Sequence, residues 1–205
     1  MNGVAASDIA SRALEAGRSE PALRRVPGEG GVWLLVGGDM AVFALLFLSF
    51  LYYRSQSSAL YAASQLALSQ GRGVANTVFL LTSSWLVASA VHQARRVHGR
   101  RPIAQIAAAM LMGTAFGASK IMEWRHVASG LSPLHNDFFT FYFMLTGIHF
   151  VHFLIGMGLL GHLLWLLRRP GWSEARSAAI ESCGVFWHMV DLLWLVLFAL
   201  LYLAR

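Results

Sequence analysis

Residues 138–167 read FFTFYFMLTGIHFVHFLIGMGLLGHLLWLL and contain no aspartate, glutamate, lysine or arginine. About 20 mostly apolar residues are enough for an α-helix to cross the hydrocarbon core of a bilayer. Because the run is uninterrupted rather than alternating, it predicts a helix and not a strand of a transmembrane barrel. Its length predicts a helix that tilts or projects beyond the lipid.

Four other runs of the same character lie on either side of this one. The predicted membrane helices cover residues 32–53, 74–92, 103–122, 138–167 and 180–203. All five prolines fall outside these ranges, and proline disrupts a helix interior. Because backbone that faces lipid must satisfy its own hydrogen bonds, the predicted fold class is all-α, an integral membrane bundle of five transmembrane helices.

The composition of the whole chain agrees with a membrane protein. Of its 205 residues, 57% are hydrophobic and 13% are charged, whereas a soluble domain carries about 25% charged residues. These values exclude a soluble globular protein, a disordered chain and a disulfide scaffold. The single cysteine, Cys183, permits no internal disulfide and no cysteine-based metal cluster.

The net charge of +6 follows from an uneven distribution of arginines. Eleven basic residues lie in three segments that the five helices place on one side, within residues 12–25, 95–101 and 168–176. The other side carries Arg54, Arg72, Arg125 and Arg205. The positive-inside rule therefore predicts a cytoplasmic N-terminus and an outer C-terminus. The basic excess is thus a topology signal, and no nucleic-acid partner is expected.

The chain divides into a tail and one membrane domain. Residues 1–30 are polar and lack the apolar core of a secretory signal, so we interpret them as a cytoplasmic tail. Within the tail, Ser7–Ala16 is expected to form a short surface helix. Residues 31–205 form the membrane domain, in which the polar loop 55–73 is expected to be short-helical or irregular.

Ionisable side chains at membrane depth are costly, and most of them are functional or paired. The candidate internal polar network consists of Asp39, Asn76, Lys120, Glu123, His149, His152, Glu181, His188 and Asp191. Lys120 and Glu123 are three residues apart and are expected to pair on one helix face. Glu181, His188 and Asp191 fall within a sector of roughly 80°, so that face is expected to contact protein rather than lipid.

Asp39 is the most isolated of these charges, because its own helix offers no basic partner three or four residues away. Since burial disfavours the charged form of a carboxyl group, we expect Asp39 to be protonated or hydrogen-bonded near neutral pH. Two interpretations stay open. One is a proton-handling carboxyl group, and the other is a hydrogen bond between helices to Asn76, Ser83 or Ser84.

The histidines raise the question of a cofactor. A single haem on His188 and a histidine of residues 138–167, or zinc or copper on His149 and His152, is geometrically open. Hydrogen-bonded histidines between helices are the simpler interpretation, so no catalytic, cofactor-binding or metal-ligating residue is assigned. Small residues at positions 109, 113, 117 and 156 should let neighbouring helices approach closely.

Four motifs resemble the cytochrome c oxidase subunit III family. Asn76–Ser84 is similar to its Asn-Thr, Leu-Leu and Ser pattern, and Lys120–Trp124 to a signature at the end of the following helix. Thr146–Gly156 resembles its Thr-Gly-Phe-His-Gly-x-His-x-x-x-Gly motif. Trp187–Trp194 resembles its Trp-His-Phe-Val-Asp-x-x-Trp motif. The motifs occur in the family order, and the similarity covers residues 27–205.

Two departures refine the resemblance. The long form of the family has seven helices, and this chain resembles the five-helix bacterial form, which puts the lipid-holding cleft of the long form in doubt. Asp39 stands where the family carries a glutamate. Residues 27–33, PGEGGVW, resemble the NorE-type branch, accessory proteins of nitric oxide reductase, and we favour that branch over an oxidase subunit.

The resemblance implies a non-catalytic accessory subunit of a respiratory haem–copper oxidase superfamily complex, either a nitric oxide reductase or a cytochrome oxidase. Such a subunit, in the bacterial inner (plasma) membrane, has no redox cofactor of its own. Haem and copper, or non-haem iron, are expected in the catalytic partner. The subunit would stabilise that partner, hold phospholipid, and aid proton uptake or gas access. The alternatives are an independent proton-coupled transporter and a single-haem b-type membrane cytochrome.

Overall fold

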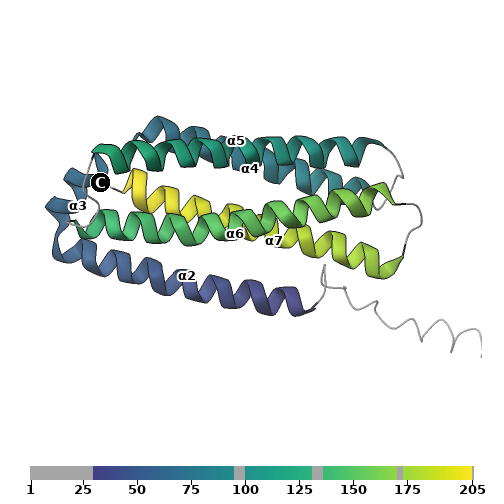
Figure 1. The fold of residues 1–205 in the computed structure, drawn as a ribbon. Coiled ribbons are helices and arrows are strands. Elements are labelled where there is room, and N and C mark those ends of the chain that lie inside the picture. Colours follow the sequence, from purple (N-terminus) through teal and green to yellow (C-terminus); the bar gives the residue numbers. More distant parts are fainter. Residues whose placement is uncertain (1–29, 95–99, 131–135, 170–172, 205) are drawn as a thin grey trace, which may run out of the picture.

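Five long helices run side by side and form an elongated bundle (Figure 1). The computed structural model describes residues 30–94, 100–130, 136–169 and 173–204, and all regular structure within these ranges is helical. The long helices are α2 (Gly30–Gln56), α4 (Gln70–Ala94), α5 (Arg100–Gly130), α6 (Asp137–Arg168) and α7 (Glu174–Phe198). A short helix, α3 (Ser58–Gln65), joins α2 to α4, and a π-helical turn, η2 (Ala199–Leu203), continues α7.

All five long helices are long and apolar enough to span a membrane, which confirms the predicted all-α membrane bundle. The sidedness of the two termini stays a prediction. The predicted helix at Ser7–Ala16 lies outside the described residues. The loop predicted as short-helical or irregular contains α3.

The helices extend beyond the predicted bounds because their first and last turns are polar. The hydroxyl of Ser173 accepts a hydrogen bond from the backbone N–H of Arg176 and caps α7, so this helix begins six residues before the predicted start. Pro102 lies in the first turn of α5, where proline is tolerated because no helical hydrogen bond is lost. Hydropathy locates the apolar part of a helix and not its ends.

Side-chain caps also fix the short connection at the opposite end of the bundle. The side chain of Asn136 accepts from the backbone N–H of Phe138 at 2.9 Å and starts α6. Its amide also donates to the hydroxyl of Ser64 on α3 at 2.8 Å. Gln65 and Gln70 donate to the carbonyls of Leu200 and Tyr202. These bonds tie α3 and the start of α4 to the end of the last helix.

The last helix forms the centre of the bundle and α2 its edge. In the most apolar stretch of each span, 61% of the α7 residues are buried, compared with 11% of those in α2. Helix α7 contacts α4 and α6, whereas α2 lies along the outside of the bundle (Figure 1). Trp187 and Trp194 on α7 are among the largest fully buried side chains, as expected for packing residues.

Small residues allow the close packing that their spacing predicts. A Cβ atom at Gly156 on α6 would lie 2.9 Å from the Trp187 ring, and one at Gly113 on α5 would lie 3.4 Å from the same ring. At Gly117 a Cβ atom would lie 3.3 Å from Phe153. Gly156 therefore makes room for the Trp187 ring, and Gly113 makes room for the Met157 sulfur, which a Cβ atom there would approach to 2.7 Å.

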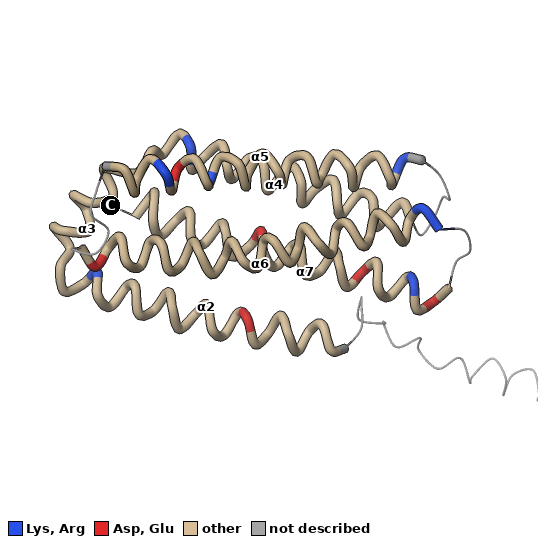
Figure 2. The backbone as a smooth tube through the Cα atoms, in the orientation of Figure 1, with Lys and Arg blue, Asp and Glu red and all other residues tan. Residues whose placement is uncertain are grey.

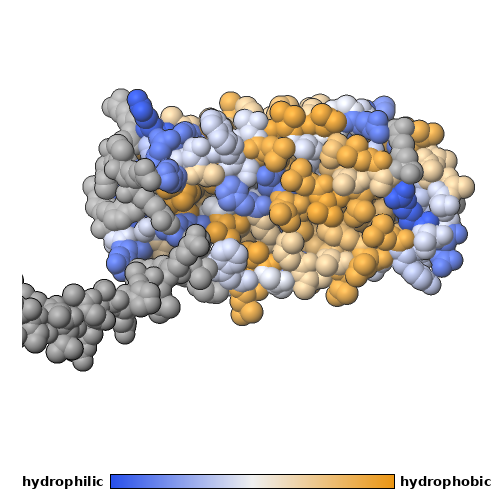
Figure 3. Space-filling model, turned by 180° about the vertical axis from the view of Figure 1, so that it is seen from behind, coloured by the Kyte–Doolittle hydropathy of each residue, from blue (hydrophilic) through white to orange (hydrophobic). Residues whose placement is uncertain are grey.

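Charged residues gather toward the two ends of the bundle, and between them single acidic residues lie on α2, at Asp39, and on α7, at Asp191 (Figure 2). We call the end that carries Arg101, Arg168, Arg169 and Arg176 the arginine-rich end. The outer surface between the ends is mostly apolar (Figure 3). An apolar belt of this kind is what a lipid-facing surface requires.

Candidate functional site

The most enclosed polar group lies around Lys120 on α5, in the half of the bundle away from the arginine-rich end. Lys120 and Glu123 are each 1% exposed, and their charged groups are 3.0 Å apart. The ammonium group also donates to the hydroxyl oxygens of Tyr142 on α6 and Tyr202 on η2, at 3.1 and 3.0 Å. The Tyr202 hydroxyl donates in turn to the second carboxylate oxygen of Glu123 at 2.6 Å.

Lys120, Glu123 and Tyr202 form a closed hydrogen-bonded ring, and Tyr142 joins it through its contact with Lys120; we call these four side chains the Lys120 cluster. Every strong donor of the ammonium group has an acceptor, which is the condition under which a buried charge is tolerated. The ammonium group also lies 5.3 Å from the centre of the Trp194 ring, within the range of a cation–π contact. The cluster joins α5, α6 and η2. It therefore stabilises the packing of these three elements against one another and is not an open site.

A second polar pair joins α2 to α6. Asp39 Oδ1 lies 3.5 Å from His152 Nε2, and the two side chains are 28% and 19% exposed. The other ring nitrogen, Nδ1, lies 2.9 Å from the carbonyl oxygen of Ile148. Since a carbonyl oxygen only accepts, Nδ1 carries a hydrogen and Nε2 is left to face the carboxyl group.

This geometry corrects the partner expected for Asp39. The structure places His152 of α6 beside it, and not Asn76, Ser83 or Ser84. The Ser83 hydroxyl donates to the carbonyl of Ala109 on α5. The Asp39–His152 pair has room for one proton between Nε2 and Oδ1, so it can be a carboxylate with an imidazolium or two neutral groups.

His149 is buried and separate from that pair. Its Nε2 lies 3.0 Å from the carbonyl oxygen of Val190 on α7, so this nitrogen donates across the helix interface. Its ring also packs against Phe116 and Trp194. The arrangement agrees with a histidine that holds two helices together, because Nε2 bonds the backbone of α7 and the ring packs against Phe116 and Trp194.

A third group lies between α4 and α7. The Ser84 hydroxyl is 2.6 Å from Nδ1 of His188, which links the two helices. One turn further along α7, Asp191 is 6% exposed, and its Oδ1 has no hydrogen-bond partner in the described part of the chain. Glu181 lies two turns before His188 and accepts from the Ser177 hydroxyl at 3.1 Å.

The candidate polar residues thus fall into separate groups instead of one continuous network. Asn76 stands alone. It is fully buried, and within the described ranges neither atom of its amide group has a hydrogen-bond partner. Among the described residues no three His, Cys, Asp or Glu side chains meet in an arrangement that could hold a metal ion.

Sequence reasoning did not include Tyr142 and Tyr202 among the site residues. They are 22 and 82 residues from Lys120 along the chain, so helical spacing could not link them to it. Ser84 was proposed as a partner of Asp39 but contacts His188. In both cases the missing information was which helices are neighbours in space.

Comparisons with known proteins agree with the motifs. A family model described as cytochrome c oxidase subunit III matches residues 8–204. Cytochrome c oxidase subunit 3 of Synechocystis sp. is 30% identical over 174 residues, which cover 84% of this chain and 74% of the relative. Quinol oxidase subunit 3 of Bacillus subtilis is 26% identical, with 84% and 85% covered. Cytochrome bo(3) ubiquinol oxidase subunit 3 of Pseudomonas putida is 28% identical, with 84% of both chains covered.

The family model covers the whole described bundle, including the helices that carry the Lys120 cluster and the Asp39–His152 pair. The chain belongs to the cytochrome c oxidase subunit III family.

Proposed function

We propose that this chain is the non-catalytic subunit III of a respiratory haem–copper oxidase complex in the bacterial inner membrane. The observation that carries the proposal is the family match over residues 8–204, together with relatives that are subunit 3 of cytochrome c and quinol oxidases. In this proposal the chain packs beside a catalytic subunit that holds the haem and metal centres. Its own contribution is to stabilise that subunit within the membrane.

The geometry of the polar groups supports a structural role. The Lys120 cluster and His149 have all their strong polar contacts within the chain. Such closed groups hold a bundle rigid, because opening any of them would leave a buried polar group without a partner. A rigid bundle is what a stabilising neighbour of a catalytic subunit requires.

The Asp39–His152 pair supports an additional proton-related role. It lies within the membrane, is partly exposed, and can gain or lose one proton between Nε2 and Oδ1. Groups of this kind within a membrane are functional candidates. We propose that this pair is where the subunit binds a proton near the complex. The NorE-type assignment stays a prediction from residues 27–33.

Purification of the tagged chain tests the proposal. A tag after Arg205 would allow isolation from the native membrane in mild detergent, followed by identification of the co-purifying chains and a reduced-minus-oxidised spectrum. We expect a haem–copper catalytic subunit to be recovered. After separation in a harsher detergent, the tagged chain should show no haem absorbance.

Each other outcome selects an alternative. A chain recovered alone and colourless would contradict the proposal and favour an independent transporter. A haem band that stays with the separated chain would favour a membrane cytochrome. If a catalytic subunit is recovered, its identity decides between oxygen and nitric oxide as the substrate of the complex.

A further inference from the structure

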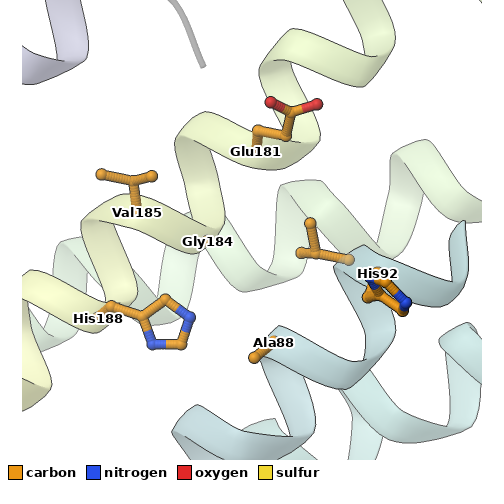
Figure 4. Close-up of a pocket in the computed structure, with 7 residues that line it drawn as sticks. Ala88, His92, Glu181, Gly184, Val185 and His188 are labelled. Carbon is orange, nitrogen blue, oxygen red and sulfur yellow. The ribbon is translucent and has the colours of Figure 1, made fainter. Parts of the chain in front are cut away.

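A crevice of about 230 Å³ lies between α4 and α7, toward the arginine-rich end. His92 and Ala88 line it from α4, and Glu181, Gly184 and His188 from α7. The His188 ring points across the gap toward Ala88, and His92 lies one turn further along α4 (Figure 4). A Cβ atom at Gly184 would lie 3.4 Å from Val91, so the absence of a side chain there helps to keep the crevice open.

The inner part of the crevice lies deep in the membrane span. His188 is near the middle of the span Glu174–Leu203, roughly 21 Å from either end at the rise of an α-helix. Hydrophilic residues interrupt the apolar surface between the two ends of the molecule (Figure 3). The crevice therefore brings polar groups to a depth where most of the surface is apolar.

Only one of the two ring nitrogens of His188 has a hydrogen-bond partner among the described residues. Its Nδ1 contacts the Ser84 hydroxyl at 2.6 Å, whereas its Nε2 has no hydrogen-bond partner within them. An imidazole nitrogen that faces hydrocarbon is costly, so a polar occupant in the crevice would be favourable.

Lipid is a poor occupant at this depth. Acyl chains form no hydrogen bonds, and the hydrocarbon core is about 30 Å thick, which keeps a headgroup about 15 Å from its centre. A neighbouring transmembrane helix can present a polar side chain at any depth, and such interhelical hydrogen bonds are common in membrane bundles. The negative charge of Glu181 in the wall favours an occupant that donates hydrogen bonds.

We infer that the α4–α7 crevice is the docking site for a transmembrane helix of the catalytic subunit, with a hydrogen-bond donor of that helix reaching toward His188. The inference rests on the proposed function. It identifies the α4–α7 face of this chain as the one that contacts the catalytic subunit. The contrast with α2 supports it. There the polar group at membrane depth, Asp39, already faces a partner within the chain, so that face needs only lipid.

Site-specific photo-crosslinking in native membranes tests the inference. A photoreactive phenylalanine analogue placed at Val185, which lines the crevice, should crosslink to the catalytic subunit. The control position is Leu45 on α2, which is 65% exposed and should crosslink no catalytic subunit. The reverse pattern would overturn the inference, and so would crosslinks from Val185 to lipid, to a second copy or to this chain alone.

A pair of matched substitutions gives an independent measurement. Ala88→Trp would fill the crevice and Ala44→Trp would place the same ring on the outside of α2, since both alanines are exposed. We expect Ala88→Trp to reduce the recovered catalytic subunit about tenfold or more at an unchanged membrane level of the tagged chain. Ala44→Trp should match the unmodified protein. Equal recovery with both variants would overturn the inference.

The two proposals fail in different ways. If the unmodified chain recovers no haem–copper subunit, the proposed function is wrong. If the unmodified chain recovers that subunit but the crosslinks come from Leu45, the proposed function stands and the docking face is wrong.

Discussion

The Lys120 cluster and the α4–α7 crevice differ in how their polar side chains find hydrogen-bond partners within the membrane. Around Lys120, a buried cation is enclosed by a carboxylate and two hydroxyl groups from other helices. At His188, one ring nitrogen contacts Ser84 and the other opens into a crevice. Closed groups hold this chain together by themselves, whereas an open group marks where something else completes the structure.

The comparison has a thermodynamic consequence. Removing one member of a closed group leaves its partners buried without hydrogen bonds, so the folded chain itself should lose stability. Removing a group that points out of the chain should change association more than folding. Each prediction below separates these two effects, beginning with the largest.

Lys120→Met should destabilise the chain most. The substitution leaves the Glu123 carboxylate 1% exposed with only the Tyr202 hydroxyl as a donor. Breaking a buried ion pair from one side costs about 3–5 kcal/mol. Thermal unfolding of the purified protein in mild detergent should show the loss as a lower midpoint and a lower yield.

The control for this variant removes both charges. Lys120→Met combined with Glu123→Gln leaves no buried charge, so it should recover most of the stability that the single variant loses. If the single variant unfolds at the same temperature as the unmodified protein, the cluster does not stabilise the packing of α5, α6 and η2.

Tyr202→Phe should have the next largest effect. It removes a hydroxyl group that accepts from Lys120 and donates to Glu123, while the ring keeps its packing against Trp194. Loss of one buried hydrogen-bonding partner costs about 1–3 kcal/mol. Tyr52→Phe, on an exposed tyrosine of α2, is the matched control and should leave the unfolding midpoint unchanged. Equal midpoints for the two variants would show that the hydroxyl group contributes nothing.

His188→Ala should affect assembly more than folding. The side chain is exposed in the isolated chain and makes one hydrogen bond within it, to Ser84, so its removal should cost about 1 kcal/mol in the free energy of unfolding. Recovery of the catalytic subunit should fall strongly, because the crevice loses its polar group. Asp191→Asn should reduce recovery in the same direction. Normal recovery with both variants would mean that neither side chain takes part in assembly.

The five spans could be predicted from the sequence because an apolar run of membrane length allows little else. The pairing of Lys120 with Glu123 could be predicted as well, since residues three apart share a helix face. Both results depend on local order along the chain. Neither requires knowledge of which helix lies next to which.

The remaining contacts could not be predicted, because they depend on the arrangement of the helices. Partners for Asp39 were sought on the helices that follow it in the sequence, but α2 meets α6, and His152 lies beside it. Tyr202 reaches Lys120 from the far end of the chain, through a π-helical turn that no hydrophobic pattern indicates. Periodicity assigns a face to each helix but not the neighbour of that face.

Breaking the Asp39–His152 pair should have the smallest effect on the free energy of unfolding. Its main effect should be on the chemical reactivity of Asp39. Both side chains are partly exposed, so breaking the pair should cost about 0–1 kcal/mol. His152→Phe keeps an aromatic ring next to Phe43 but removes the base that faces Asp39. Without it, the Asp39 carboxyl group loses the polar side chain that faces it across the α2–α6 contact.

Carbodiimide labelling at neutral pH measures this change, because the reagent attacks protonated carboxyl groups. We expect His152→Phe to raise the labelling of Asp39 severalfold over the unmodified protein, in which His152 Nε2 lies 3.5 Å from the carboxyl group and hinders attack on it. His162→Phe is the matched control, since that exposed histidine on the same helix stacks on Trp165 and should leave the labelling unchanged. Equal labelling in all three proteins would mean that His152 does not affect the reactivity of Asp39, and this polar pair would then be only a contact between α2 and α6.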